Sequence, residues 1–133
     1  MNHIQSPRVD DAAIEQEIQA KADNGPRVTP ADIEASIASE HYFTAADGVT
    51  GAKFNAEPRQ TVGIDTSPLP LHLLTFCVLV LRNGFTVTGE SACASPENFN
   101  AEIGRRIARE NAEREIWPLL GFALRQKLHD QGC

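Results

Sequence analysis

The most constraining feature of this sequence is an Asn83-Gly84 pair set between two runs of strand-forming residues. Asn and Gly tolerate the positive φ angles of a two-residue type I′ turn, so the pair predicts a β-hairpin over residues 72–94. With these two residues as the whole loop, Val80 should lie opposite Val87. One face of the hairpin should then carry Phe76, Val78, Val80, Phe85 and Val87.

The first of these strands is apolar on both faces, which is typical of a strand covered on both sides. A chain of 133 residues supplies few helices to do this. We therefore expect a second subunit to cover one face of the sheet, and the protein to be an oligomer.

A long amphipathic helix is expected over residues 96–129, with apolar side chains that recur every three to five residues and stay near one face. Ser95 can cap it, Pro96 suits its first turn, and Glu97 lies where the helix dipole favours an acid. Pro118 cannot continue the hydrogen-bond ladder, so we expect a kink or a break close to it.

The N-terminal part gives weaker signals. Residues 1–27 form a polar, acidic arm, which is either an accessory helix or a disordered tail. A short helix is expected over Pro30–Ser39, capped by Thr29. Residues 44–71 are rich in Gly, Pro, Asn, Asp and Thr and predict a long loop: a lid, a partner-binding arm or a mobile insertion.

The expected fold class is therefore α+β. A small antiparallel β-sheet with the hairpin at its centre should pack against the long C-terminal amphipathic helix and a short N-terminal helix. Residues 28–133 should form a single domain of this kind.

Charge and composition exclude several classes of partner. The net charge of −6 disfavours binding to DNA or RNA polymers. The longest apolar run, Leu69–Leu81, is too short and too interrupted to span a bilayer of about 30 Å, and the N-terminus lacks the regions of a secretory signal. We expect a cytoplasmic protein with reduced thiols, because Cys77, Cys93 and Cys133 show no CxxC spacing.

No catalytic or metal-binding pattern is present in the sequence. The histidines are scattered without a metal-ligand spacing, and Ser91 and Cys93 lack a nucleophile elbow. There is also no phosphate-binding loop. We expect no enzymatic activity, no catalytic residues, no metal and no cofactor.

One pair of arginines suggests an anion site. Arg105 and Arg109 lie one turn apart on the long helix, whereas Arg106 and Arg114 each follow an acid by four residues and can pair with it. Guanidinium groups in such a pair suit bidentate binding of phosphate. The alternative is a solvated charged stripe in which Arg109 pairs with Glu113.

The hairpin and the helix start also carry a resemblance. LLTFCVLVLRNGFTVTGESAC over residues 73–93, followed by SPENF and EIG, closely resembles a phage protein family named after gene 49 and gene 66 of two phages, and the match extends over roughly residues 28–128. The family is similar to the group that contains the first Thoeris anti-defence protein. That resemblance implies a sponge, which binds a cyclic ADP-ribose signal without cleaving it.

The resemblance also implies partners and a location. Members of that group form dimers that assemble to hexamers, and some also hold cyclic di- or trinucleotides. The protein would act in the cytoplasm of the infected or lysogenic bacterial host. Here Ile116–Phe122 departs from the Leu-Glu-Gly-Tyr-like continuation of relatives, which leaves the choice of ligand open.

For a ligand of this kind the candidate residues divide by chemistry. Arg105 and Arg109 would bind phosphate, with Arg82 as a second anion contact; Phe99 or Phe85 would pack against a base; and Asn98 or Ser91 would bond ribose or phosphate oxygens. A competing hypothesis from another class is a phage accessory protein that inhibits a host protein by direct contact through the hairpin and the long loop.

Overall fold

A computed structural model of the chain describes residues 8–20, 25–56 and 67–132. The elements follow in the order α1 (Arg8–Ala20), α2 (Pro30–Ser36), β1 (Ile37–Thr44), α3 (Ala45–Ala56), α4 (Leu69–His72), β2 (Leu74–Leu81), β3 (Thr86–Ala92), the 3-10 helix η1 (Pro96–Asn98) and α5 (Ala101–Asp130). No helix in these ranges is long and apolar enough to cross a membrane.

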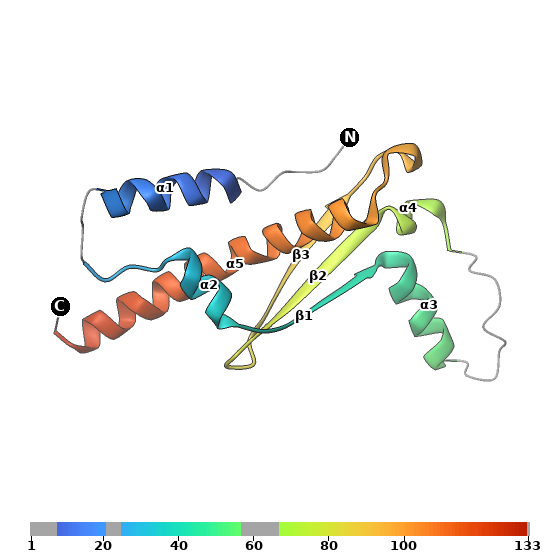
Figure 1. The fold of residues 1–133 in the computed structure, drawn as a ribbon. Helices are drawn as coiled ribbons and strands as arrows, with labels where there is room; N and C mark the ends of the chain where they lie inside the picture. The colour runs from blue at the N-terminus through green and yellow to red at the C-terminus, as the bar shows by residue number, and fades with distance from the viewer. Residues whose placement is uncertain (1–7, 21–24, 57–66, 133) are drawn as a thin grey trace.

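The strands form one antiparallel sheet in the order β1-β2-β3, and the long helix α5 lies across one face of it (Figure 1). Ile33 of α2 joins the same core, together with β2, β3 and the middle of α5. The predicted α+β fold, with a small antiparallel sheet packed against a long C-terminal helix, is confirmed.

Strand β1 was not predicted. The sequence predicted that α2 would continue to Ser39, but it ends at Ser36, whose hydroxyl donates to the carbonyl of Ile33 at 2.6 Å. The next residues alternate in exposure and include a tyrosine and a phenylalanine, which favour a strand. Because β1 pairs along the whole of β2, the apolar strand of the hairpin becomes the centre of the sheet.

The prediction of a continuous loop over residues 44–71 was also wrong. Thr44 and Asp47 form a capping box: the amide of Asp47 donates to the Thr44 hydroxyl at 3.1 Å, and the amide of Thr44 donates to the Asp47 carboxylate at 2.9 Å. This box starts α3, so residues 45–56 of the expected loop form a helix. Residues 57–66 of the expected loop lie outside the described residues.

The hairpin is present, but its loop has three residues. The amide of Gly84 donates to the carbonyl of Leu81 at 2.9 Å, and the amide of Leu81 donates to the carbonyl of Phe85 at 2.8 Å. Gly84 has φ +90°, as the last residue of a type I turn followed by a bulge requires. Val87 therefore pairs with Leu79 and not with Val80.

This shift by one residue moves each side chain of β3 to the other face of the hairpin relative to those of β2. The side of β2 that packs under α5 consists of Thr75, Cys77, Leu79 and Leu81, all buried. Phe76, Val78 and Val80 lie on the opposite face and are half-buried. The predicted grouping of Phe85 and Val87 with these three residues was therefore wrong.

The second face of the sheet carries an apolar strip on the side away from α5 (Figure 1). Helix α3 reaches this strip at its Phe43 end, where a Cβ atom on Gly48 would lie 3.8 Å from the Phe43 ring. We name this surface the open face; it consists of Ser39, His41, Phe43, Phe76, Val78, Val80, Thr86, Thr88 and Glu90. Phe43 is 39% exposed, and its ring lies 5.6 Å from that of Phe76 between centroids.

Helix α5 begins later than predicted. Pro96–Asn98 form a 3-10 turn, and α5 starts at Ala101 with the side chain of Asn100 accepting from the amide of Ile103 at 3.0 Å. The Ser95 hydroxyl bonds to the Glu97 carboxylate and caps no helix. The expected break at Pro118 does not occur, because this residue lies on the exposed side of α5, where water can replace the missing backbone bond.

A glycine fixes the position of α5 on the sheet. A Cβ atom on Gly89 would lie 2.2 Å from the carbonyl oxygen of Ala108 and 2.3 Å from the amide nitrogen of Ala112, so the helix backbone rests directly on β3. Asn111 adds a bond from its side-chain amide to the carbonyl of Glu90 at 2.8 Å. Because of this close approach, the side chains of α5 before and after residue 110 lie beside different ends of β3.

Candidate functional site

The predicted site residues fall into separate groups. Arg82 and Phe85 lie at the hairpin tip, before β3 begins, whereas Asn98 and Phe99 follow its far end. A strand of this length spans roughly 20 Å, and β3 has seven residues. One chain therefore does not gather all of the predicted residues in one pocket.

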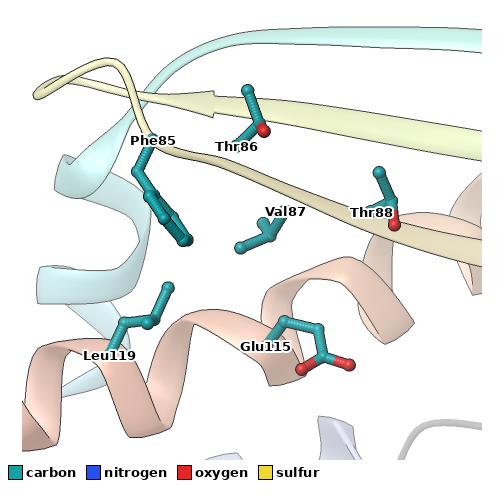
Figure 2. A pocket seen from close by; sticks show the side chains of 6 residues that line it. All are labelled: Phe85, Thr86, Val87, Thr88, Glu115 and Leu119. Atoms are coloured by element: carbon teal, nitrogen blue, oxygen red, sulfur yellow. The ribbon is translucent and has the colours of Figure 1, made fainter.

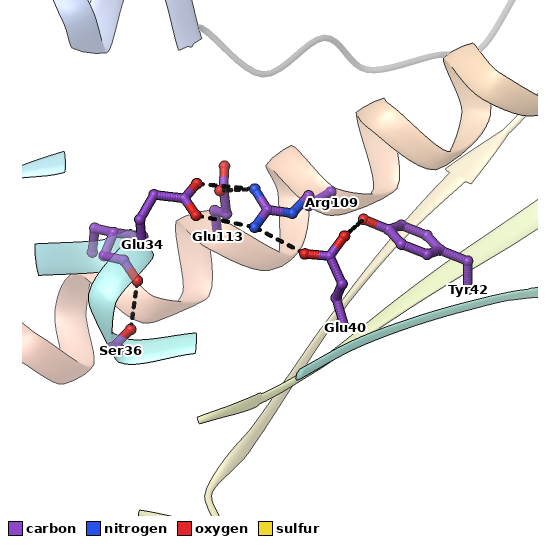
Figure 3. Close-up of polar contacts among 7 residues, drawn as sticks. Glu34, Ser36, Glu40, Tyr42, Arg109 and Glu113 are labelled. Carbon is purple, nitrogen blue, oxygen red and sulfur yellow. Dashed lines mark hydrogen bonds and ion pairs between the residues drawn. The ribbon is translucent and has the colours of Figure 1, made fainter. Parts of the chain in front are cut away.

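Arg109 lies between three carboxylates from three elements (Figure 3). It donates to both oxygens of Glu34 on α2 at 3.0 and 3.2 Å, and to Glu113 on α5 at 2.6 Å. Glu40 on β1 lies 3.2 Å from its Nη2 atom and accepts a bond from the Tyr42 hydroxyl at 3.0 Å. We name these five residues the Arg109 cluster.

The Arg109 cluster has an excess of negative charge. Its hydrogen bonds to Glu34 raise the pKa of Arg109, and burial, with the bond to Glu40, raises the pKa of Tyr42. Glu113 is 6% exposed, whereas the other two carboxylates are exposed. A phosphate could reach Arg109 only by displacing Glu34 or Glu40, so in this structure the guanidinium ties α2, β1 and α5 together.

Arg105 and Arg106 differ from Arg109, because both are exposed and neither bonds to any residue that the structure describes. The expected pair between Arg106 and Glu102 is thus not formed. Arg105 lies one turn before Arg109 on α5, with its guanidinium accessible. It is the member of the predicted arginine pair that an anion can reach without breaking an ion pair.

The candidate ligand-binding side chains at the far end of β3 differ in their exposure to solvent. Ser91 is buried on the face under α5, Asn98 is exposed in η1, and Phe99 is half-buried just before α5. A ligand can reach Asn98 and part of Phe99, whereas Ser91 is inaccessible. Beside them lies an apolar hollow of about 430 Å³ lined by Leu69, Pro70, Leu73, Leu74, Ala92, Cys93, Ala94 and Pro96.

A second hollow, which we name the hairpin pocket, lies between the start of β3 and α5 (Figure 2). Its volume is about 300 Å³, and it is lined by Phe85, Thr86, Val87, Thr88, Glu115 and Leu119. The ring of Phe85 is 55% exposed and points toward Leu119 (Figure 2). The carboxylate of Glu115 accepts no hydrogen bond from the described residues.

The edge of β3 gives this pocket its remaining polar groups. Phe85 and Val87 pair with β2, so the backbone groups of the alternate residues Thr86 and Thr88 point outward from the sheet. By the same alternation along β3, the carbonyl of Glu90 points outward, where it accepts a hydrogen bond from the side-chain amide of Asn111. The hairpin pocket thus combines an aromatic ring, an aliphatic wall, a strand edge with donors and acceptors, and one carboxylate.

Arg82 at the hairpin tip uses some of its hydrogen-bond donors within the fold. Its backbone amide donates to the carbonyl of Ser36 at 2.9 Å, and its Nε donates to the carbonyl of Ala35. These bonds fasten the tip to the junction of α2 and β1. The Nη groups of the side chain have no partner in the described part of the chain, so they can still meet an anion.

Of the residues that line the hairpin pocket, Phe85 was the one predicted as a site residue. Sequence reasoning missed the other five, which include Glu115 and Leu119 on α5. Glu115 and Leu119 are four residues apart and so share one face of α5. Sequence reasoning could place them beside Phe85 only with the correct register of the hairpin, which puts Phe85 on the helix side of the sheet. Within the described ranges, no three His, Cys, Asp or Glu side chains are grouped so that they could hold a metal ion.

Comparison with known proteins gives one match. The model of the family described as "Phage protein (N4 Gp49/phage Sf6 gene 66)" matches residues 28–128. The match includes the sheet, the Arg109 cluster and the hairpin pocket, and it leaves out α1. Neither a curated protein nor a solved structure matches the chain.

Proposed function

We propose, because this chain belongs to the phage protein (N4 Gp49/phage Sf6 gene 66) family, that it is a phage-encoded binding protein that sequesters a cyclic nucleotide immune signal without cleaving it. The ligands would be cyclic ADP-ribose-type signals, including the glyco-cyclic form, and cyclic di- or trinucleotides. Acting in the cytoplasm of the infected or lysogenic host, it would inhibit Thoeris-type bacterial immunity by keeping the signal from its effector.

The hairpin pocket is the observation that carries this proposal. Its volume of about 300 Å³ is at the lower end of the range of about 300–1,000 Å³ for small-molecule sites. A base stacked on an aromatic side chain gains about 1–3 kcal/mol, and the exposed ring of Phe85 offers such a surface opposite Leu119. The outward backbone groups of Thr86 and Thr88 can hydrogen-bond the base.

The phosphates of such a ligand would remain outside the pocket, because no basic side chain lines it. Arg82 is three residues before Phe85 and has free Nη groups. It is therefore the first candidate for a phosphate contact at the hairpin pocket. Arg105 would serve ligand groups at the other end of β3, together with Asn98 and Phe99.

The open face supports the second part of the proposal, a homo-oligomer built on a dimer. Phe76, Val78 and Val80 present apolar, half-buried side chains there, on the face of β2 opposite to the one under α5. Two sheets pack face to face at about 10 Å, so a second copy can cover this strip with its own. The dimer could assemble further to a hexamer.

Calorimetric titration of purified protein tests this function. We expect saturable binding of a cyclic ADP-ribose isomer or a cyclic oligonucleotide, and recovery of the same nucleotide intact after heat release. The variant Phe85→Ala should weaken binding about tenfold, because it removes the stacking surface. If the parent binds none of these ligands, or returns a cleaved product, the sponge function is wrong.

The competing function is inhibition of a host protein by direct contact, and the open face is the observation that favours it. An apolar surface of this kind commonly marks a protein interaction site. A protein that remains monomeric, binds no nucleotide and forms a defined complex with a host protein would establish this alternative.

A further inference from the structure

We propose that the hairpin pocket selects guanine over adenine, and that Glu115 makes this choice. The inference rests on the proposed function, since it names the base that this pocket would take. Glu115 lines the pocket, is exposed to solvent and accepts no bond from the described residues. An accessible carboxylate without a partner, in a pocket that an exposed aromatic ring also lines, is suited to bind the polar edge of a base.

The chemistry of the carboxylate determines which base fits. An ionised carboxylate only accepts hydrogen bonds, and its two oxygens can accept two parallel ones. Guanine presents two adjacent donors, N1–H and the N2 amino group, on one edge. Adenine presents a single amino donor with ring-nitrogen acceptors on either side of it, so the second oxygen of Glu115 would face an acceptor.

The other groups of the pocket do not discriminate between the two purines. Phe85 and Leu119 contact the ring faces, which are apolar in both. The edge of β3 at Thr86 and Thr88 offers amides and carbonyls alike, so it can serve the acceptors of guanine or the mixed edge of adenine. Glu115 is the one side chain among the lining residues that accepts hydrogen bonds and donates none.

A preference for guanine would distinguish between the two classes of proposed ligand. A cyclic ADP-ribose signal carries adenine, whereas cyclic oligonucleotides can carry guanine. The hairpin pocket would therefore bind guanine-bearing cyclic oligonucleotides in preference to adenine-bearing signals. Because no basic residue lines the pocket, the preference would come from the base and not from the phosphates.

The test is a titration of the full chain with cyclic di-GMP and cyclic di-AMP, which share a backbone and differ in the base. One bidentate contact is worth about 1–3 kcal/mol of discrimination, so the parent should prefer cyclic di-GMP by about tenfold or more. Glu115→Gln should remove or reverse this preference, because a glutamine amide can both donate and accept and so suits adenine.

Glu102→Gln is the matched control, since it neutralises an exposed glutamate in the first turn of α5, outside the pocket. It should keep the preference of the parent. Equal binding of both dinucleotides by the parent, or an unchanged preference in Glu115→Gln, would overturn the inference and leave the sponge function intact. If cyclic ADP-ribose isomers bind and neither dinucleotide does, the inference is wrong; if none of them binds, the proposed function is wrong as well.

Discussion

Arg109 donates to Glu113 at 2.6 Å within α5, and the same Nη1 group donates to Glu34 at 3.0 Å on α2. One guanidinium thus links the central helix to the segment that leads into β1. The pair that the sequence offered as the alternative to phosphate binding, Arg109 with Glu113, is the pair that forms. Arg109 consequently has a structural role in the fold described here.

The first prediction follows from this role. Arg109→Ala should lower the free energy of unfolding by about 1–3 kcal/mol, because it removes the guanidinium that bonds the buried Glu113 carboxylate at 2.6 Å. Urea denaturation measures the change. Arg106→Ala is the control on the same helix and should shift stability by no more than about 0.5 kcal/mol, since Arg106 is exposed. Equal effects of the two variants would show that the Arg109 cluster contributes nothing to stability.

A second prediction concerns the contact between β3 and α5. Gly89→Ala places a Cβ atom 2.2 Å from the Ala108 carbonyl oxygen, and both partners are backbone, so the helix must move off the strand. We expect a loss of at least about 3 kcal/mol, the upper end of the cost of overpacking. Thermal unfolding with the circular dichroism of α5 as the probe would detect it.

Gly121→Ala is the matched control for that substitution. A Cβ atom on Gly121 meets nothing within 4 Å, and the residue lies inside α5. Alanine has the higher helix propensity, so this variant should gain up to about 1 kcal/mol. If Gly89→Ala is tolerated as well as Gly121→Ala, the close approach of helix and strand is wrong.

A third prediction concerns alkaline pH. Burial raises the pKa of Cys77 from 9.0 to about 11, so between these values the native thiol stays protonated while the unfolded one ionises. The native state then binds more protons, and stability must fall as the pH rises through this window, by about 1–3 kcal/mol. The raised pKa of Tyr42 acts in the same direction.

Chemical denaturation at pH 8, 9, 10 and 11 measures that slope, and Cys77→Ala provides the comparison. The variant should be less stable at pH 8 because it leaves a small cavity, but its stability should fall less steeply above pH 9. Parallel curves for parent and variant would exclude Cys77 as a source of the alkaline loss.

The sequence predicted the central strand, the hairpin and the long helix, because each depends on local signals. It could not decide the register of the hairpin. An Asn-Gly pair fits both a two-residue type I′ loop and a three-residue loop that ends in Gly84, and β2 is apolar enough on both sides to accept either. The buried side of β2 is determined by α5, which packs on Cys77 and Leu79.

The candidate site was harder to predict than the fold, because it depends on contacts between residues that are far apart in the sequence. The i, i+4 rule indicates the pairing of Arg109 with Glu113, but Glu34 is 75 residues away in the sequence and reaches Arg109 only because β1 returns beside β2. The predicted helix ended at Ser39 and the predicted loop began at residue 44, so Glu40 was assigned to no element. Two of the three carboxylates around Arg109, Glu34 and Glu40, were therefore not accessible to sequence reasoning.

The last prediction tests the oligomer through the open face. Val78 lies at the middle of the central strand, opposite His41 and Thr88, and its side chain points away from α5. Val78→Arg should convert a dimer into a monomer of 14.5 kDa, because a dimer would bury the charge without a partner. The monomer itself can hold this arginine at its surface, so its fold should persist. Ala13→Arg adds the same group at an exposed position of α1 and should leave the dimer unchanged. Light scattering at micromolar concentration reads the mass, and a parent protein that is already a stable monomer would refute the oligomer.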